Sequence, residues 1–326
     1  MIRKTIITLA FIFLAATSVY SADFSNFSLK LSGGLAILSG GDNLSSNRSN
    51  AVIPNLYEKP KNRHSINPTL MFDMRYYDER RRNEYYFNPI RMMHGGVSGG
   101  VKHKYDKGSI DLSGFFNILD KQWENPYALN RSATPSANYG FDVKTSGLLA
   151  DSLSLGYKVS FTSIDNDAIG NAYQSLKRDG ASHKIHAGYK IKAADAVAIT
   201  PSLSFERALY SGGANRFSGY GAELGANLRL DEGRMLMAKV SVSENVYDAV
   251  HPIFNKKRED TNYGASLMYI IFKPFGWEHW HATMGATHQR SVANIVFFDK
   301  EFTVALAALG YTFGKQRGQE DAITIR

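Results

Sequence analysis

Histidine and aspartate residues occur in this sequence at two spacings that suit metal binding. His279 and His281 flank Trp280, so in a β-strand both imidazoles would project from one face and could share a metal ion. No carboxylate or third histidine follows at a fixed spacing. The run Asp165-Asn166-Asp167 has calcium-ligand chemistry but lacks the remaining ligands of a calcium loop, so we interpret it as a solvated turn. We therefore expect no metal ion and no cofactor.

Neighbouring serine and histidine residues raise the question of acyl-transfer chemistry. Ser182 and His183 are adjacent, and His288 is followed by Ser291. A nucleophile needs a base within hydrogen-bond reach and a third group that orients the base, and strand spacing supplies neither. The glycine-rich run 95–100 lacks the strand–loop–helix context of a phosphate loop and is expected to relieve crowding where a strand bends. The sequence therefore predicts a protein that is not an enzyme.

Composition narrows the fold classes that could position these residues. The chain has 326 residues, of which 44% are hydrophobic and 21% are charged, and it contains no cysteine. Disulfide scaffolds, cysteine zinc sites and cysteine catalysis are thereby excluded. Outside the N-terminus, no apolar stretch reaches the length of about 18 residues that a transmembrane helix needs. A soluble β protein or a membrane β-barrel remains.

The dominant pattern is strict alternation of apolar and polar residues, which indicates strands with one apolar and one polar face. Segment 153–162 is the clearest case, and 26–38, 197–206 and 220–230 repeat it. In 153–162 the apolar face comprises Leu153, Leu155, Tyr157, Val159 and Phe161. A soluble sandwich would bury such faces against each other, whereas a barrel would turn them to lipid.

The connectors alternate between short and long, which favours the membrane barrel. Tight turns occur at 106–108, 193–196 and 231–234, while 39–66, 120–136, 165–180 and 247–261 are long and polar. Outer-membrane barrels have short periplasmic turns and long outer loops. We predict an all-β transmembrane antiparallel barrel of about 14 strands, or 12 if the short segment 84–91 merges with its neighbours. The predicted strands are 26–38, 67–77, 84–91, 93–105, 109–119, 137–147, 153–164, 181–192, 197–209, 218–230, 235–246, 262–272, 280–290 and 301–313.

The polar strand faces would form a wet lumen that carries charged residues. An excess of positive charge in a narrow channel would attract anions, whereas ion pairs across the lumen would only stiffen the barrel, and the sequence leaves both readings open. In the closing strand Phe302, Val304 and Leu306 are apolar on the nominal lumen side, which suggests packing against an interior plug. Trp277 and Trp280 are expected in an aromatic girdle. The candidate lumen charges are Lys158, Lys184, Lys190, Lys192, Glu206, Glu223, Arg229 and Lys239.

The N-terminus indicates export. Arg3 and Lys4 precede an apolar run from Ile6 to Ala16 and small residues suited to cleavage after Ser21 or Ala22. We therefore expect a signal peptide at 1–21, the barrel at 22–313 and a hydrophilic periplasmic tail at 314–326, with the protein in the cell outer membrane. The basic runs 80–82 and 256–258 are expected to be solvated or to bind anionic lipid head groups, and no nucleic-acid partner is expected.

The C-terminal third resembles the barrel of a known protein family. The matching stretches include Tyr247-Asp248, Pro252-Ile253-Phe254, Lys257-Arg258-Glu259-Asp260 and the final Gly310-Tyr311-Thr312-Phe313. Weaker matches are Gly40-Gly41-Asp42-Asn43-Leu44 and Arg75-Tyr76-Tyr77-Asp78. In their order along the chain, these stretches are similar to the C-terminal outer-membrane barrel module of surface lipoprotein assembly modifiers (Slam), without the N-terminal tetratricopeptide region. The family-like residues are Asp248, Phe254, Arg258, Asp260, Ser291, Asn294, Asp299 and Phe313.

The resemblance implies a barrel that helps deliver proteins across the outer membrane. The implied partners are outer-membrane lipid, the barrel-insertion machinery and an exported lipoprotein client. The alternative function is a passive, porin-like channel with a mild preference for anions. Measuring channel conductance and the surface exposure of lipoproteins would separate these two functions.

Overall fold

The structure is a computed structural model that describes residues 25–88 and 96–315. The expected signal peptide, all but two residues of the expected tail, and the ends of the predicted strands 84–91 and 93–105 that face each other lie outside the described residues. Within them, strands dominate and follow one another along the chain. The strands are β1 (Phe27–Asp42), β2 (Arg63–Asp78), β3 (Asn83–Asn88), β4 (Val97–Tyr105), β5 (Gly108–Trp123), β6 (Ala133–Gly147), β7 (Leu153–Ile164), β8 (Gly180–Tyr189), β9 (Ile191–Ala194), β10 (Val197–Tyr210), β11 (Phe217–Arg229), β12 (Arg234–His251), β13 (Lys256–Phe272), β14 (Trp280–Ala293) and β15 (Lys300–Gly314).

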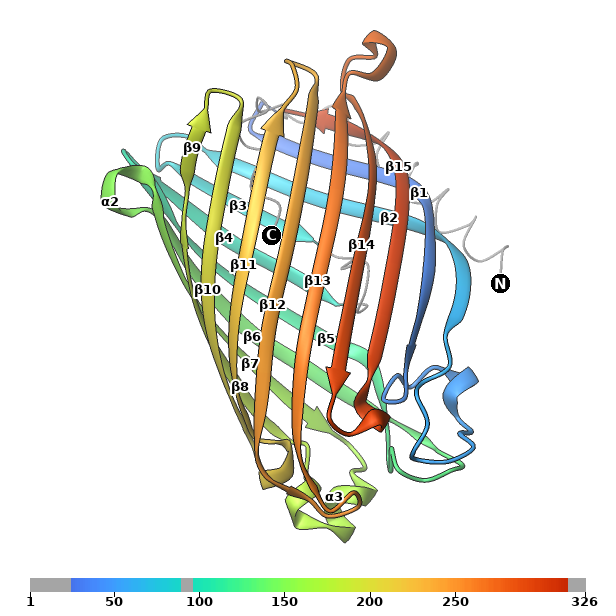
Figure 1. Ribbon diagram of the computed structural model, residues 1–326. Helices are drawn as coiled ribbons and strands as arrows, with labels where there is room; N and C mark the ends of the chain where they lie inside the picture. The colour runs from blue at the N-terminus through green and yellow to red at the C-terminus, as the bar shows by residue number, and fades with distance from the viewer. Residues whose placement is uncertain (1–24, 89–95, 316–326) are drawn as a thin grey trace.

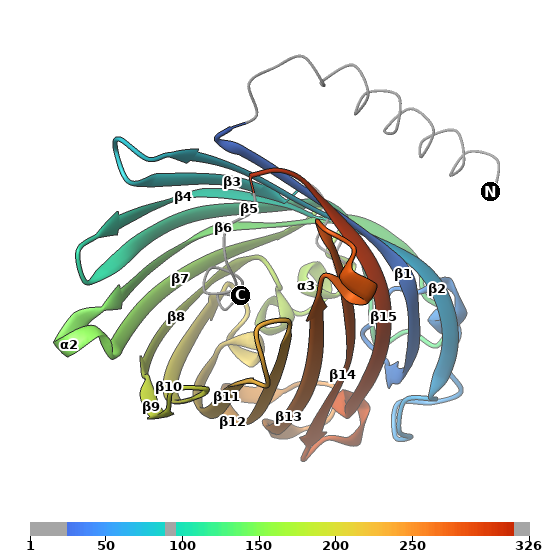
Figure 2. The same cartoon turned by 90° about the horizontal axis from the view of Figure 1, so that it is seen from above.

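The strands form a closed antiparallel barrel (Figures 1 and 2). Apart from β8 and β9, each strand pairs with its neighbours in sequence, β1 pairs with β15, and the pairing of β10 with β11 closes the ring. The segments β8 and β9 both pair with β10 and are one strand interrupted at Lys190, so the barrel has 14 strands, as predicted. The weakest predicted strand, 84–91, is present as the short β3.

Helical elements are short and lie in the connections. They are η1 (Arg48–Asn50), α2 (Leu148–Asp151), α3 (Ala168–Ala172), η2 (Gln174–Leu176), η3 (Gly213–Asn215), η4 (Pro274–Gly276) and η5 (Val296–Phe298). Among the described residues there is no helix with the length and apolar character needed to cross a membrane.

The outer face of the barrel carries the apolar half of each alternating strand. Leu35, Leu155, Leu203 and Val240 are large hydrophobic residues that remain exposed, with Leu203 at 68%. A soluble protein rarely exposes a continuous apolar surface, whereas a barrel in a bilayer presents such a band to hydrocarbon. Aromatic residues cluster along the band, for example Tyr139 stacked on Phe161 with ring centroids 5.4 Å apart.

The two ends of the barrel differ in their connections. The turn end holds both chain ends of the barrel and short turns such as 106–107 and 195–196, whereas the loop end holds long connections such as 43–62 and 165–179 (Figure 1). Several strands run further toward the loop end than predicted. β13 begins at Lys256 rather than at 262, because alternation continues through a charged stretch in which Arg258 and Asp260 point inward and are buried. The prediction of this stretch as a solvated loop was therefore wrong.

Candidate functional site: the loop cap and the lumen

Six connections at the loop end fold together into one structure, which we call the loop cap. Its cores contain Ile53, Phe297 and Phe298 in one cluster and Ile169 and Leu176 in another. Tyr127 contacts both clusters and joins them. Because these side chains are buried although they lie in loops, the loops form a packed unit. The loop cap comprises residues 43–62, 124–132, 165–179, 211–216, 252–255 and 294–299.

Tyr127 reaches across the barrel mouth. Its loop joins β5 and β6, and its partners lie on the far wall, at the end of β12 and on the loops β12–β13 and β14–β15. Around the ring, four strands separate β6 from β12 on one side and six separate β5 from β13 on the other. The Tyr127 hydroxyl lies 2.8 Å from Nε2 of His251, and its ring packs 5.8 Å from Phe254 and 5.3 Å from Phe297. Side chains from nearly opposite walls therefore meet over the mouth.

The geometry around His251 assigns its proton. The backbone N–H of Ile253 donates to Nδ1 of His251 at 3.3 Å, so the neutral ring carries its proton on Nε2 and donates it to the Tyr127 hydroxyl. His251 is 1% exposed. Burial, assisted by the nearby Arg258 charge, lowers the pKa of His251 to about 4. Burial also raises the pKa of Tyr127 above its usual range. Both groups are therefore neutral at physiological pH.

A buried ion pair supports this aromatic cluster from below. Nε and an Nη atom of Arg258 donate to the two carboxylate oxygens of Asp260 at 2.8 and 2.5 Å. The guanidinium carbon lies 3.7 Å from the centroid of Phe298 and 4.4 Å from that of Tyr247. Burial opposes the charge, but Tyr247 and Asp260 outweigh burial and raise the pKa of Arg258. A bidentate, ring-covered arginine of this kind fixes geometry more than it adds stability.

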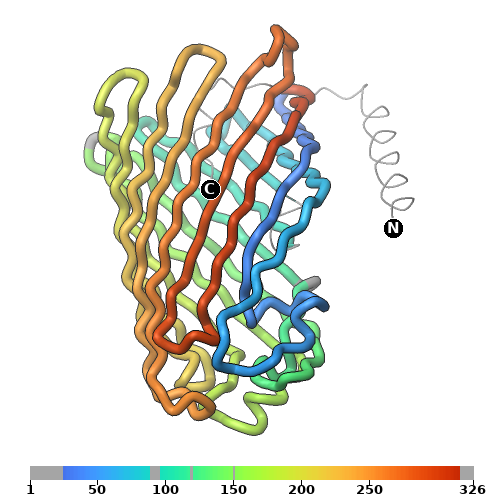
Figure 3. Tube along the Cα trace, turned by 45° about the vertical axis from the view of Figure 1, so that its right-hand side comes forward, coloured from blue at the N-terminus to red at the C-terminus, as the bar shows by residue number. Residues whose placement is uncertain are grey.

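Arg131 holds two loops together through their backbone. Its guanidinium donates to the carbonyl oxygens of Asn43, at 2.5 Å, and of Asn50, at 3.0 Å from Nε. Burial lowers its pKa to about 10, partly offset by Asp42, so the group stays charged at neutral pH. Val52 and Asn130 form an antiparallel bridge between the same two loops. Figure 3 shows the loop β1–β2 beside the loop β5–β6 at the loop end.

The remaining loops are joined in the same way. Asp167 is buried, N-caps α3 by accepting from the Gly170 N–H at 3.2 Å, and pairs with Arg178 at 2.6 Å. The Asn215 amide donates to the Leu176 carbonyl at 2.8 Å. The interpretation of 165–167 as a solvated turn was thus wrong for Asp167, because its carboxylate satisfies a short helix and an arginine rather than water.

Most family-like residues gather at the loop end. Phe254 lies in the core of the loop cap, and Asp260 pairs with Arg258. Asn294 accepts from the N–H of Glu259 at 3.0 Å and donates to the carbonyl of Lys257 at 2.8 Å.

The other family-like residues lie around these. Asp299 accepts from the Ala293 N–H at 2.9 Å, and Ser291 is buried on the same strand as Ala293. Asp248 pairs with Arg207, whose hydrogen bonds lower the pKa of Asp248. Phe313 is the exception, because it lies at the turn end and packs 4.6 Å from Tyr311.

The candidate lumen charges fall into two groups. Lys239 lies 3.1 Å from Glu223, Lys184 lies 4.0 Å from Glu206, and the Lys158 ammonium lies 4.7 Å from the Phe115 ring centroid. These charges are partnered within the wall. Lys190, Lys192 and Arg229 are exposed near the turn end and have no ion-pair partner among the described residues.

A second charged ladder lies on the other half of the lumen. Arg75 donates to Asp73 at 2.6 Å and to Glu84 at 2.5 Å, and the Tyr86 hydroxyl donates to Asp111 at 2.7 Å. Gly100 makes this last bond possible, since a Cβ there would lie 2.5 Å from the Tyr86 hydroxyl. Sequence analysis did not select Glu84 or Tyr86 as site residues, because only the strand register brings them beside their partners.

The serine and histidine candidates do not assemble into a catalytic group. Ser182 donates to Glu206 inside the barrel at 2.5 Å, while His183 bonds Tyr157 at 2.7 Å on the outer face. His288 bonds Thr303 on the outside, away from the inward and buried Ser291.

The two candidate metal-binding histidines also separate. His279 lies in the turn before β14 with a φ of 67°, whereas His281 points inward and contacts Ser32 at 2.9 Å. They do not share one face, because the turn ends the strand between them. No group of three potential metal-ligating side chains occurs within residues 25–88 and 96–315.

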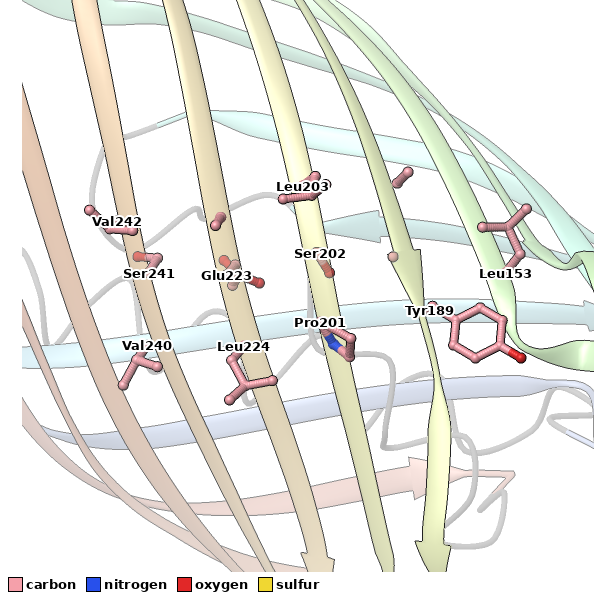
Figure 4. Close-up of a pocket in the computed structure, with 13 residues that line it drawn as sticks. Leu153, Tyr189, Pro201, Ser202, Leu203, Glu223, Leu224, Val240, Ser241 and Val242 are labelled. Atoms are coloured by element: carbon pink, nitrogen blue, oxygen red, sulfur yellow. The ribbon is translucent and has the colours of Figure 1, made fainter.

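One hollow lies on the apolar wall itself. It is lined chiefly by outward side chains of β10, β11 and β12, around Leu203, Leu224 and Val240 (Figure 4). Small neighbours such as Ala222 leave the depression between the larger residues. Its apolar lining continues the band that surrounds the barrel, so we treat it as part of that surface.

Comparison with solved structures finds β-barrels of low sequence identity. A FadL homologue from Pseudomonas aeruginosa is 9% identical with a TM-score of 0.40, covering 88% of this chain and 90% of that one. An anion-selective porin from Comamonas acidovorans is 7% identical with a TM-score of 0.43, covering 88% and 98%. An outer-membrane channel from Pseudomonas putida F1 is 12% identical with a TM-score of 0.43, covering 90% and 99%.

No curated protein matches the chain. A family model does match, over residues 26–312, which span the barrel from its first strand to its last. The match includes both the loop cap and the lumen ladders. The chain therefore belongs to the family described as "Protein of unknown function (DUF2860)".

Proposed function

We propose that this protein is an outer-membrane transport barrel that is closed at rest by its loop cap. The apolar band supports a position in the bilayer, since a sheet that turns exposed leucine and valine outward is stable only against hydrocarbon. The short turns, the start of β1 and the end of β15 all lie at one end of the barrel. This supports an orientation with the turn end in the periplasm and the loop cap at the cell surface. The expected signal peptide is consistent with this route.

The observation that carries the proposal is the contact between Tyr127 and His251. A hydrogen bond to the end of β12 and an aromatic cluster join the loop β5–β6 to the nearly opposite wall, so passage through the mouth requires these contacts to separate. Packed loops of this kind open as a unit, at a free-energy cost set by the side chains they bury. The barrel is thus a gated conduit rather than a permanent pore.

The paired lumen charges argue against an ion-selective pore. The pairs Lys239–Glu223 and Lys184–Glu206 neutralise charges that would otherwise select small ions. The exposed Lys190, Lys192 and Arg229 leave a basic entrance at the turn end, which would favour anionic groups arriving from the periplasm.

A finer proposal concerns the cargo. The family-like residues belong to stretches that resemble the barrel of surface lipoprotein assembly modifiers. With the exception of Phe313, they lie in or beside the loop cap, where an exported client would emerge at the cell surface. We propose an exported protein as that client. Protease shaving of intact cells with and without the gene tests this, and an unchanged set of surface proteins would eliminate the client.

The closed state itself is tested by conductance in planar bilayers. The wild-type barrel is expected to be silent apart from rare openings, while Tyr127→Ala should conduct for much of the time. Tyr173→Ala is the matched control, since that tyrosine lies in the loop cap but is half exposed. A large steady current through the wild type, equal to that of Tyr127→Ala, would refute the proposal.

A further inference from the structure

Part of the inner wall of the barrel is apolar, over β12, β13, β15 and β1. Ala36 of β1 pairs with Leu306 of β15, and Met268 of β13 pairs with Met237 of β12. Gly285 of β14 lies between Leu306 and Met268 in the same row and has no side chain to interrupt it. With one further pair toward the loop end, these residues form a surface that we call the inner apolar patch: Ala36, Leu38, Met237, Met268, Val304 and Leu306.

The inner apolar patch is unusual for the lumen of a membrane barrel, which is normally polar. Ala36 is buried and the other members are half-buried. The patch ends at β2, where the polar Asn67 and Thr69 face the lumen in register with Ala36 and Gly34. The apolar lumen side of the closing strand is therefore one part of a surface that extends from β12 to β1. Such a surface gains free energy when an apolar ligand removes it from water.

Charged side chains occupy another part of the inner wall. Lys158 of β7 and Lys184 of β8 pair in register, and Asp142 of β6 and Glu206 of β10 flank them. The Lys144 ammonium lies 3.1 Å from Asp142, and that of Lys184 lies 4.0 Å from Glu206. This group thus combines three ammonium groups with two carboxylates. Because like charges that face each other on neighbouring strands repel, an anion beside the two paired lysines would stabilise them.

The lysine pair faces the inner apolar patch across the lumen. β1 and β8 lie seven strands apart in both directions around the ring of 14, on opposite sides of the barrel (Figure 2). The row of paired residues that starts at Lys184 and passes through β7 reaches β1 at Ser28. In the other direction the row passes Ala293 and would meet β1 just beyond its end at Asp42. Because the strands of a closed barrel share one tilt, the level of Lys184 on β1 lies midway, at about Ala36.

The width of the lumen suits a long amphiphile. Fourteen strands spaced about 4.8 Å apart and tilted by about 40° enclose a barrel with a backbone diameter of about 28 Å. Lysine side chains from one wall and leucine and methionine side chains from the other shorten this interval. A long alkyl chain can therefore reach the inner apolar patch while its head group stays at the ammonium groups.

We propose that the lumen binds an anionic amphiphile with a long alkyl chain. Its head group binds at Lys158 and Lys184, and its chain lies on the inner apolar patch. Charge-assisted hydrogen bonds to the ammonium groups favour an acid over an alcohol of the same chain length. The site lies in the barrel wall below the loop cap, so this inference goes beyond the proposed gate and is tested separately from it.

Photolabelling of the full-length protein in phosphatidylcholine nanodiscs tests the site. The probe is palmitate with a diazirine in its chain, and mass spectrometry identifies the residues that it modifies. We expect modification of Met268 and Leu306 that excess palmitate suppresses. Modification of Leu203 on the outer face should persist, because it reports probe dissolved in the bilayer. Labelling confined to outward residues, or inward labelling that excess palmitate does not reduce, would overturn the site while leaving the barrel and the gate untouched.

Variants separate the two halves of the site, with heat-modifiable gel migration to verify that each is folded. Leu306→Gln should lower the suppressible labelling about tenfold, and Leu306→Met should retain it. Lys184→Gln should lower labelling by the palmitate probe about tenfold but spare labelling by hexadecanol that carries the same diazirine. Lys184→Arg should retain both. Equal effects of Lys184→Gln on the acid and the alcohol, or no effect of Leu306→Gln, would contradict the proposal.

Discussion

Removal of the Phe297 side chain should open the loop cap while leaving the barrel intact. Phe297 is 0% exposed, and its ring lies 5.3 Å from Tyr127, 5.5 Å from Phe254 and 5.2 Å from Phe298. Truncation of a fully buried phenylalanine to alanine costs about 3–5 kcal/mol. Because every 1.4 kcal/mol is a factor of about ten, the equilibrium between closed and open cap should shift about a hundredfold to a few thousandfold.

Single-channel recording measures this shift as open probability. Phe297→Ala should convert rare openings into frequent ones, while its heat-modifiable migration stays like that of the wild type because no strand loses a pairing. Phe275→Ala is the matched control, since Phe275 lies in a turn at the other end and is 89% exposed. If folded Phe297→Ala opened no more often than Phe275→Ala, the cap would not be the gate.

Three further outcomes follow. Acidification should open the cap. The pKa of His251 is about 4 in the folded cap and 6.5 when the segment is unfolded, so the unfolded segment binds the proton more readily. The stability of the closed cap is therefore lost as pH falls from 6.5 through 4, by up to about 3 kcal/mol. Protonation at Nδ1 would also repel the N–H of Ile253. In His251→Phe the open probability should depend less on pH between 6.5 and 4. Leu155→Arg on the lipid face should destabilise the inserted barrel by about 2–4 kcal/mol in urea unfolding from vesicles, and equal stability would place that residue elsewhere. Lys239→Glu should lower thermal stability by about 1 kcal/mol by facing Glu223, and the double swap with Glu223→Lys should restore it; additive losses would argue against the pair.

The fold could be predicted from sequence because the strands of a membrane barrel alternate lipid-facing apolar residues with lumen-facing polar ones. Segment 153–164 was predicted as a strand, and β7 spans Leu153–Ile164. Strand ends near the loops were less accurate, because polar side chains that point into a wet lumen or a cap look like loop residues. β12 continues to His251 and β13 starts at Lys256, well inside the stretch predicted to be a loop.

The loop cap could not be predicted from sequence in the same way. It depends on contacts between residues far apart in the chain, such as Tyr127 with His251 and Asn43 with Phe297, and no local period signals them. Arg258 was interpreted as part of a solvated basic run. However, Arg258 and Asp260 are two positions apart and would share one face of a strand, which together with the nearby aromatic residues could have indicated an inward-facing ion pair.

Predicting the partners of the lumen charges required the strand register as well as the alternation of side chains. Alternation placed Lys184 and Glu206 on the inner face, but only the pairing of β8 with β10 sets them opposite each other. Sequence reasoning therefore left open whether these charges select ions or pair across the lumen. In the structure Lys184–Glu206 and Lys239–Glu223 pair between neighbouring strands of the wall rather than across the lumen, while Lys190, Lys192 and Arg229 at the turn end have no ion-pair partner among the described residues.

A reversible disulfide between two cap loops would show whether the packed loops hold the mouth shut. Val52 and Asn130 face each other in an antiparallel bridge flanked by the hydrogen bonds Ile53 N–H to Leu129 O and Arg131 N–H to Ala51 O, a geometry with Cα atoms about 4.5 Å apart that suits a disulfide. Single-channel recording of Val52→Cys/Asn130→Cys in the Phe297→Ala background should show a silent channel when oxidised and frequent openings after reductant is added. The disulfide fixes the loop that carries Tyr127 to the loop β1–β2, whose Ile53 packs in the same cluster as Phe298 and Phe254. Identical records before and after reduction of a disulfide that has formed would show that these loops do not close the mouth.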